Sequence, residues 1–154
     1  MKKLKIIIPI IILILIGFIY YFYSNRKFYL DDEYYNNTTG YMEIDSNKLN
    51  ELLNNKSSFI VFTYNEYCTL KIPCENIFKQ FMEDNEIAMY SIPFTEMQKT
   101  FIYNEVKYAP SVIIVKKGKI VSYLDANKDE DLNKYQDVNE FSNWINKYVY
   151  FKIN

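Results

Sequence analysis

The sequence predicts an α/β domain with a mixed β-sheet and helices on both faces, preceded by one transmembrane helix. Short apolar runs, such as residues 59–63 and 112–115, predict buried strands, and amphipathic stretches between such runs predict helices. The uncharged apolar stretch 6–23 is close to the minimum length of a membrane-spanning helix. With 154 residues, 49% of them hydrophobic, the chain can form one sizeable core beside that helix.

The N-terminal stretch has the order of features expected of a membrane anchor. Residues 1–5 are basic, residues 6–23 carry no charge, and the stretch ends in aromatic residues that suit a membrane interface. A small-residue cleavage site is missing, so we expect residues 1–23 to be an uncleaved signal-anchor; a cleaved secretion signal is the alternative. The N-terminal lysines outnumber Arg26 and Lys27, which predicts a cytoplasmic N-terminus and an extracytoplasmic domain in the cell membrane.

Residues 24–40 are polar and include the acidic run 31–33, so we expect a tether that holds the domain away from the bilayer. The domain itself is predicted to cover residues 41–154. Its first half alternates strands and helices. The predicted elements are a strand at 41–44, a helix capped by Asp45 or Ser46, a strand at 59–63, a helix from Pro73 to about residue 85, and a strand at 87–92.

The second half contains a hairpin. Thr95 and Gln98 fit a capping box for a helix that reaches Ile102. Residues 112–115 and 120–124 are predicted to pair across a Lys-Lys-Gly-Lys turn. A polar loop at 125–136 and a helix at 137–149, capped by Asp137 with Glu140 three residues on, complete the chain. Helical connections imply parallel strands and the hairpin an antiparallel pair, so the sheet is mixed.

Composition excludes several functions. The chain has no histidine, which removes Ser/His and Cys/His nucleophile systems and the commonest metal ligand. The net charge of −1 gives nucleic-acid binding no electrostatic support. Acidic residues alternate from Asp125 as in a calcium loop, but Glu130 replaces the required glycine and Gln136 the closing glutamate. We therefore expect a solvated loop, no metal and no cofactor.

The only two cysteines, Cys68 and Cys74, follow a predicted strand and precede a predicted helix, which is a redox arrangement when it lies in a βα unit. Residues six apart in one helix are separated by about 9 Å, too far for a disulfide. The helix must therefore begin after Cys68 if the two are to pair, and Pro73 is a favoured first helical residue. Cys68 is then the expected attacking thiol and Cys74 the resolving thiol. A structural disulfide and two unpaired thiols are the alternatives.

Three local matches indicate a family resemblance over residues 41–154. The stretch Tyr64-Asn-Glu-Tyr-Cys68 resembles the lead-in to the active site of the thioredoxin-like superfamily, with tyrosine in place of tryptophan. Ala109-Pro-Ser111, before a strand, resembles the cis-proline segment of that superfamily, and Lys117-Gly-Lys-Ile-Val121 resembles its hairpin. The resemblance implies a three-layer thioredoxin-like fold in which Pro110 is cis and packs beside the cysteine pair.

The resemblance also implies site residues. Cys68, Cys74 and Pro110 would be catalytic, and Cys68 and Cys74 would form the redox-active disulfide. Tyr64, Tyr67, Ala109 and Pro110 would bind the substrate. The chain departs from the family in the five residues between its cysteines, where thioredoxins have two, and in Phe62, which stands where thioredoxins carry a buried carboxylate. The peroxiredoxin signature is missing, because Val61 and Asn65 replace its proline and threonine.

The overall plan is similar to that of membrane-tethered thioredoxin-like proteins of Gram-positive bacteria, including bacteriocin transport accessory proteins. We therefore expect a membrane-tethered extracytoplasmic thiol–disulfide oxidoreductase or redox accessory protein that acts on a protein thiol or disulfide. The alternative is a non-catalytic binding module on the same fold, which holds a partner in an exported complex and uses its disulfide as a structural link.

Overall fold

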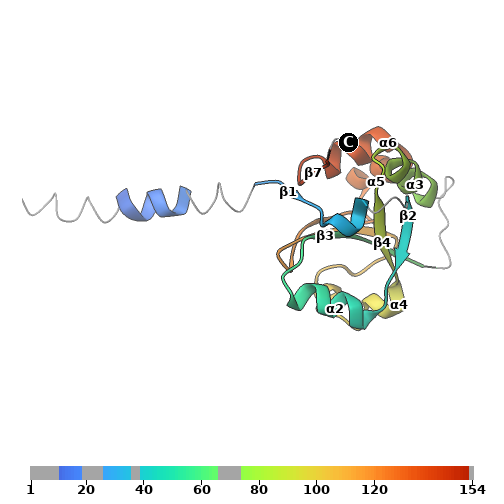
Figure 1. Ribbon diagram of the computed structural model, residues 1–154, viewed down its shortest axis with the longest axis horizontal. Coiled ribbons are helices and arrows are strands. Elements are labelled where there is room, and N and C mark those ends of the chain that lie inside the picture. Colours follow the sequence, from blue (N-terminus) through green and yellow to red (C-terminus); the bar gives the residue numbers. More distant parts are fainter. Residues whose placement is uncertain (1–10, 19–25, 36–38, 66–73, 153–154) are drawn as a thin grey trace, which may run out of the picture.

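The computed structural model describes residues 11–18, 26–35, 39–65 and 74–152 (Figure 1). Its centre is a five-stranded sheet in the order β2-β4-β3-β5-β6. The strands are β2 (Gly40–Glu43), β3 (Phe59–Tyr64), β4 (Ala88–Pro93), β5 (Ser111–Lys116) and β6 (Lys119–Tyr123). β2, β4 and β3 run parallel, whereas β5 pairs antiparallel with β3 and with β6. The predicted mixed sheet with a late hairpin is confirmed.

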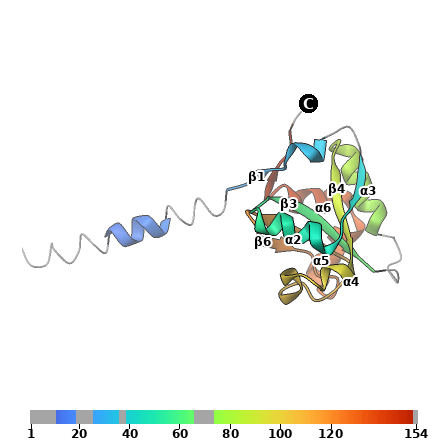
Figure 2. The same ribbon diagram turned by 60° about the horizontal axis from the view of Figure 1, so that its bottom comes forward.

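Helices cover both faces of this sheet, so the domain has three layers. The helical segments are α2 (Ser46–Asn54), α3 (Cys74–Asp84), α4 (Phe94–Met97), the 3₁₀ helix η2 (Phe101–Asn104), α5 (Asp129–Gln136) and α6 (Val138–Ile145). α3, α5 and α6 contact one another on one face, and α2 and α4 lie together on the other (Figures 1 and 2). The predicted placement of helices on both faces of the sheet is therefore confirmed.

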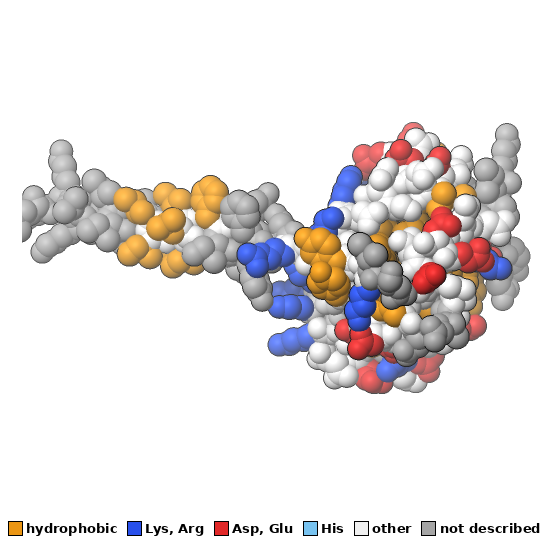
Figure 3. Space-filling view, turned by 45° about the horizontal axis from the view of Figure 1, so that its top comes forward, with side chains coloured by type: hydrophobic (Ala, Val, Ile, Leu, Met, Phe, Trp, Pro, Cys, Tyr) orange, Lys and Arg blue, Asp and Glu red, His pale blue; other side chains and the backbone are white. Residues whose placement is uncertain are grey.

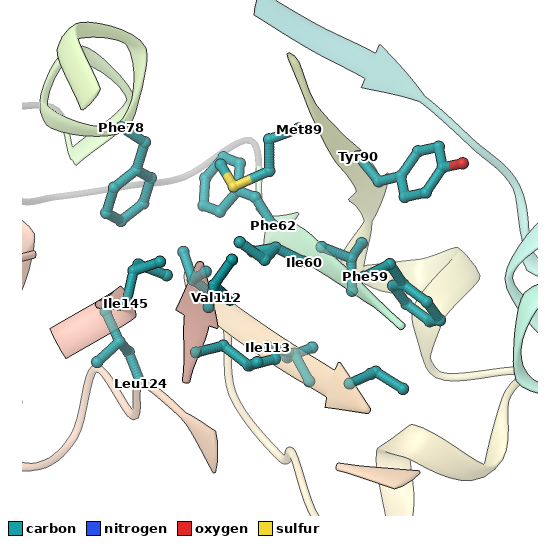
Figure 4. Close-up of a cluster of buried hydrophobic side chains, with 14 of the residues drawn as sticks. Phe59, Ile60, Phe62, Phe78, Met89, Tyr90, Val112, Ile113, Leu124 and Ile145 are labelled. Atoms are coloured by element: carbon teal, nitrogen blue, oxygen red, sulfur yellow. The ribbon is translucent and has the colours of Figure 1, made fainter. Parts of the chain in front are cut away.

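The core lies on both faces of the central strands. β3, β4 and β5 are buried along their whole lengths except for the last residue of each, as continuous apolar runs predict. Figure 4 shows Phe62 of β3 facing Phe78 of α3, and the centres of these two rings are 5.2 Å apart. Phe78 in turn packs on Phe141 of α6 at 4.5 Å, so aromatic contacts tie the sheet to two helices.

Two of the three predicted helix caps are confirmed. The Asp45 carboxylate accepts a hydrogen bond from the Lys48 N–H at 2.8 Å, and Asp137 accepts one from the Asn139 N–H at 2.7 Å. The capping box at Thr95 is wrong. α4 starts directly after the strand residue Pro93, so Thr95 lies inside a helix that ends at Met97 and is followed by the separate helix η2.

Part of the predicted tether belongs to the packed domain. β1 (Phe28–Tyr29) pairs parallel with β7 (Val149–Tyr150), and the 3₁₀ helix η1 (Asp32–Tyr35) follows β1. Three side chains of this segment are buried in the core: Phe28, Leu30 and Tyr34. Residues 28–35 thus contribute apolar side chains that a solvated tether would lack, and the expected boundary at residue 41 is too late. The last helix also ends earlier than expected, at Ile145, because Val149 is taken up by β7.

The prediction of a loop at 125–136 is wrong for residues 129–136, which form α5. Asp131 and Tyr135 lie four residues apart on one face of this helix and are both buried. The Asp131 carboxylate accepts a hydrogen bond from the Asp125 N–H at 3.0 Å and pairs with Lys134 at 2.7 Å. These contacts engage the Asp131 carboxylate, and the described residues contain no cluster of potential metal ligands.

Residues 11–18 form a helix whose large apolar side chains are about half exposed or more. The other residues of the predicted membrane segment, 6–10 and 19–23, lie outside the described residues. Within the described stretches, no helix combines the length and the apolar character that a membrane span requires. The anchor at residues 1–23 stays a prediction.

Candidate functional site

Cys74 is the first residue of α3, and only 1% of its surface is exposed. The preceding strand β3 ends at Tyr64, so Cys74 lies in the first described turn of the helix that follows it, and the predicted strand, cysteine and helix order is present. A group at a helix N-terminus lies near unpaired N–H groups and the positive end of the helix dipole. Cys68 and Tyr67, the other candidate residues of this connection, lie outside the described residues.

Pro110 lies at the same end of the sheet as the last residue of β3. Ser111 pairs with Thr63 in the antiparallel β3–β5 ladder, which brings Pro110 beside Tyr64. The Ala109–Pro110 peptide bond is cis, as the family resemblance implies. Pro110 is buried and its carbonyl oxygen accepts a hydrogen bond from the Tyr135 hydroxyl at 2.8 Å. The helix α5, which sequence reasoning missed, therefore holds the proline segment.

The aromatic core fixes α3 above the sheet. Phe78, one turn after Cys74, lies between Phe62 and Phe141, and its ring is also 6.0 Å from that of Tyr135. The chain of contacts from Pro110 through Tyr135 to Phe78 joins the proline segment to the helix of Cys74. Of the residues predicted to form the site, the structure brings Tyr64, Cys74, Ala109 and Pro110 to one end of the molecule.

A groove of about 230 Å³ opens at this end of the sheet. Its lining comes from β2, β3, β4 and the first turn of α3: Tyr41, Glu43, Phe62, Tyr64, Glu75 and Ser91. Tyr41, Glu43 and Ser91 were not among the predicted site residues. Tyr41 and Glu43 are two residues apart in β2, so their side chains lie on the same face of the sheet. Ser91 lies beside them because it pairs with Glu43 in the β2–β4 ladder. Only this alternation in residues 41–43 could have indicated them.

Tyr41 connects the groove to the cysteine helix. Its ring lies 5.5 Å from that of Phe62, and its hydroxyl donates a hydrogen bond to the Glu75 carbonyl at 3.3 Å. Burial raises the pKa of Tyr41 above its ordinary value, and electrostatic interactions with Cys74 and Glu75 raise it further. The phenol therefore stays protonated at neutral pH, and its single O–H is engaged with the Glu75 carbonyl in the first turn of α3.

Phe62 packs mainly against aromatic rings. Only 2% of its surface is exposed, and its ring contacts those of Tyr41, Tyr64 and Phe78. The carboxylates that line the groove, Glu43 and Glu75, are on β2 and α3. The site thus combines a buried sulfur, a neutral phenol and an aromatic wall.

Solved structures of thioredoxins are similar to this chain. A thioredoxin from Schistosoma mansoni is 17% identical with a TM-score of 0.50, over 72% of this chain and 97% of that one. A mutant thioredoxin from Halobacterium salinarum is 17% identical with a TM-score of 0.47, over 73% and 92%. A chain from the complex of ferredoxin:thioredoxin reductase with thioredoxin f2 is 17% identical with a TM-score of 0.44, over 63% and 92%. No protein-family model and no curated protein matches the chain.

The match to the Schistosoma mansoni thioredoxin covers 97% of that protein and reaches a TM-score of 0.50. The domain therefore has the thioredoxin fold. A fold supports many activities, so the function has to be argued from the site itself.

Proposed function

We propose that this chain is a membrane-tethered, extracytoplasmic thiol–disulfide oxidoreductase that uses Cys68 and Cys74 as its redox pair. One observation carries the proposal: the buried Cys74 begins α3 at the same end of the thioredoxin-fold sheet as Tyr64 and the cis-proline Pro110. Thiol–disulfide exchange needs one accessible thiolate and a second thiol held within reach of the first sulfur.

The burial of Cys74 assigns the two sulfurs different roles in this proposal. A thiol with 1% exposure cannot reach the disulfide of another protein, so Cys74 is the resolving thiol and Cys68 the attacking one. The Cys68 thiolate attacks one sulfur of a substrate disulfide, forms a mixed disulfide and releases the first substrate thiolate. The Cys74 thiolate then attacks the Cys68 sulfur and releases the second. Two electrons pass from the cysteine pair to the substrate, and the reverse sequence oxidises a dithiol.

The proposed substrate is an extended segment of a protein that carries a thiol or a disulfide. Ala109 and Pro110 lead into β5, and Tyr64 is half-buried at the end of β3, so the peptide of this proposal lies across the end of these two strands. Tyr67, next to Cys68, completes this substrate-binding set in the proposal. The predicted anchor at residues 6–23 would keep the reaction at the membrane surface.

The test uses Cys74→Ser in the full chain, with oxidised glutathione as the probe. We expect the variant to accumulate a stable glutathione adduct on Cys68, detected by intact mass and peptide mapping, because the resolving thiol is gone. Cys68→Ser is the matched control and should stay unmodified, because the remaining thiol is buried. The wild type should react and return to an internal disulfide. Absence of the adduct on Cys74→Ser would refute the proposal.

Phe62 favours a second candidate, a non-catalytic binding module of an exported complex. Its apolar surroundings leave no buried carboxylate to carry protons for the cysteine pair at that position. In this second proposal the disulfide is structural and the groove of Tyr41, Tyr64 and Glu75 holds a partner protein. A structural disulfide has a reduction potential below about −300 mV, whereas a catalytic one lies higher, so the potential distinguishes the two proposals.

A further inference from the structure

The end of the domain opposite the cysteine site is made of three segments that meet at the start of β3. These are residues 26–29, 56–58 and 116–119. The Lys116 ammonium donates a hydrogen bond to the Arg26 carbonyl at 2.5 Å, and the Gly118 N–H donates one to the Ser57 carbonyl at 2.9 Å. The hairpin turn, the end of α2 and the start of β1 are therefore held together as one surface.

This surface, which we name the basic end, is defined by its positively charged side chains: Arg26, Lys27, Lys56, Lys116, Lys117 and Lys119. The three segments contain no Asp or Glu. Among the acidic residues of η1, Asp32 pairs with Lys152, and Glu33 accepts a hydrogen bond from Tyr90. Figure 3 shows Lys and Arg side chains gathered beside the N-terminal helix, around a hydrophobic patch. The basic end thus has a net positive charge in a chain whose formal net charge is −1.

Two exposed tyrosines lie at the basic end. Tyr29 of β1 is 61% exposed and Tyr150 of β7 is 47% exposed, with their ring centres 5.3 Å apart. The Lys27 ammonium lies 5.1 Å from the centre of the Tyr150 ring. Exposed tyrosines beside lysines are the combination that prefers the headgroup region of a bilayer, because the rings are amphipathic and the ammonium groups meet phosphates.

The chain connection keeps the basic end near the N-terminal helix. Only residues 19–25 separate the exposed apolar helix at 11–18 from Arg26. Seven residues of extended chain reach at most about 25 Å. If the N-terminal helix is in a membrane, the basic end is therefore the part of the domain held closest to it, whereas the cysteine site lies at the other end of β3.

We propose that the basic end docks on the anionic headgroups of the membrane that holds the N-terminal helix, and that this docking directs the cysteine site away from the bilayer. The inference rests on the anchor of the proposed function and adds an orientation to it. The positive charge and the exposed tyrosine pair fit an anionic lipid surface. A domain oriented in this way presents Tyr64 and Pro110 to proteins that approach from the aqueous side.

The test reconstitutes the full chain in vesicles of phosphatidylcholine alone and of phosphatidylcholine with an equal amount of phosphatidylglycerol. A membrane-impermeant acetylating reagent labels exposed lysines briefly, and mass spectrometry measures each site. Lys79 on α3 is exposed and away from the basic end, so it serves as the internal reference. We expect labelling of Lys117 and Lys119, relative to Lys79, to fall about threefold or more in the anionic vesicles only, and high salt should restore it.

A matched pair of variants tests the role of charge. Lys117→Gln with Lys119→Gln should abolish the protection of Lys56, because each basic residue near an anionic surface contributes about fivefold in partitioning. Lys107→Gln with Lys128→Gln removes the same charge elsewhere and should leave that protection unchanged. Equal labelling in both lipids, or loss of protection in both variants, would overturn the docking.

The outcomes also separate this inference from the proposed function. A chain that floats with the vesicles but shows no protection refutes docking and leaves the anchor in place. A chain that floats with neither vesicle refutes the anchor, and the docking with it. The glutathione adduct on Cys74→Ser is read independently of both results.

Discussion

Tyr34→Phe should destabilise the domain strongly, although it removes a single oxygen atom. The Tyr34 hydroxyl donates a hydrogen bond to the Ile60 carbonyl and accepts one from the Ile60 N–H, each at 3.1 Å. The pairing of β3 with β4 starts at Val61, so Ile60 has no partner residue in β4. The Tyr34 hydroxyl bonds to the Ile60 backbone groups in place of that strand. Tyr34 is 1% exposed and Ile60 is fully buried, which prevents water from replacing the hydroxyl.

The size of the effect follows from the two backbone groups left without a partner. Each buried, unsatisfied group costs about 1–3 kcal/mol, so we expect a loss of about 3 kcal/mol in the free energy of unfolding. At a urea dependence of about 2 kcal/mol per molar, the unfolding midpoint falls by about 1.5 M. The assay is a urea titration followed by the fluorescence of Trp144, the only tryptophan in the chain, which is 6% exposed.

Tyr35→Phe is the matched control. The Tyr35 hydroxyl accepts a hydrogen bond from the exposed Lys152 N–H at 3.2 Å, and water can replace that contact. We expect this variant to lose less than about 1 kcal/mol. If Tyr34→Phe is as stable as Tyr35→Phe, then residues 28–35 are not part of the cooperative domain and the argument from hydrogen bonding is wrong.

Three further predictions concern stability. Gly118→Ala should lower the free energy of unfolding by about 2 kcal/mol or more in the same urea titration. The φ angle of Gly118 is +73°, and an added Cβ would lie 2.5 Å from the Leu53 carbonyl oxygen. An unchanged free energy of unfolding would contradict this packing. Asp137→Ala should lower the free energy of unfolding by about 1 kcal/mol, because α6 loses its N-terminal cap. Asp84→Ala, at the carboxyl end of α3, is the control and should leave the free energy of unfolding unchanged. Equal losses in the two variants would refute the cap. Burial raises the pKa values of Tyr34, Tyr41 and Tyr90 in the folded protein. The stability that these buried phenols contribute is therefore complete below about pH 10 and is lost as the pH rises above that value. A urea midpoint that stays constant above about pH 10 would contradict the burial of these phenols.

The central sheet could be predicted because its strands are buried on both faces. Residues 59–63 and 112–115 are continuous apolar runs, and they form β3 and β5. The helix that starts at Cys74 was also predictable, since Pro73 and the spacing of Phe78 and Phe81 mark its start and its buried face. These signals are local, so the sequence is enough to read them.

The elements that were missed depend on partners distant in the sequence. β1 is two residues long, and its pairing with β7 at the other end of the chain leaves no local pattern. The charges of residues 31–33 obscure the burial of Leu30 and Tyr34. α5 has a low content of apolar residues and is held by Tyr135, whose bond to Pro110 spans 25 positions.

Some residues of the candidate site could also be predicted from local sequence, and others could not. The place of Cys74 followed from helix geometry, and the cis state of Pro110 was implied by the family resemblance. Tyr41, Glu43 and Ser91 enter the groove through strand register, and a shift of one residue would turn them to the other face. Register between β2 and β4 is set by contacts across the sheet, which no local motif in residues 40–43 specifies.

The most direct test of the proposed function is a redox titration of the Cys68–Cys74 pair in the full chain. The protein is equilibrated in glutathione and dithiothreitol buffers of defined potential, and alkylation with mass detection counts the reduced thiols. We expect one two-electron transition above about −300 mV, with the fold intact on reduction and Cys68 alkylated far faster than the buried Cys74. A pair that remains oxidised below that potential and unfolds on reduction, or two thiols that never form a disulfide, would contradict the proposed oxidoreductase.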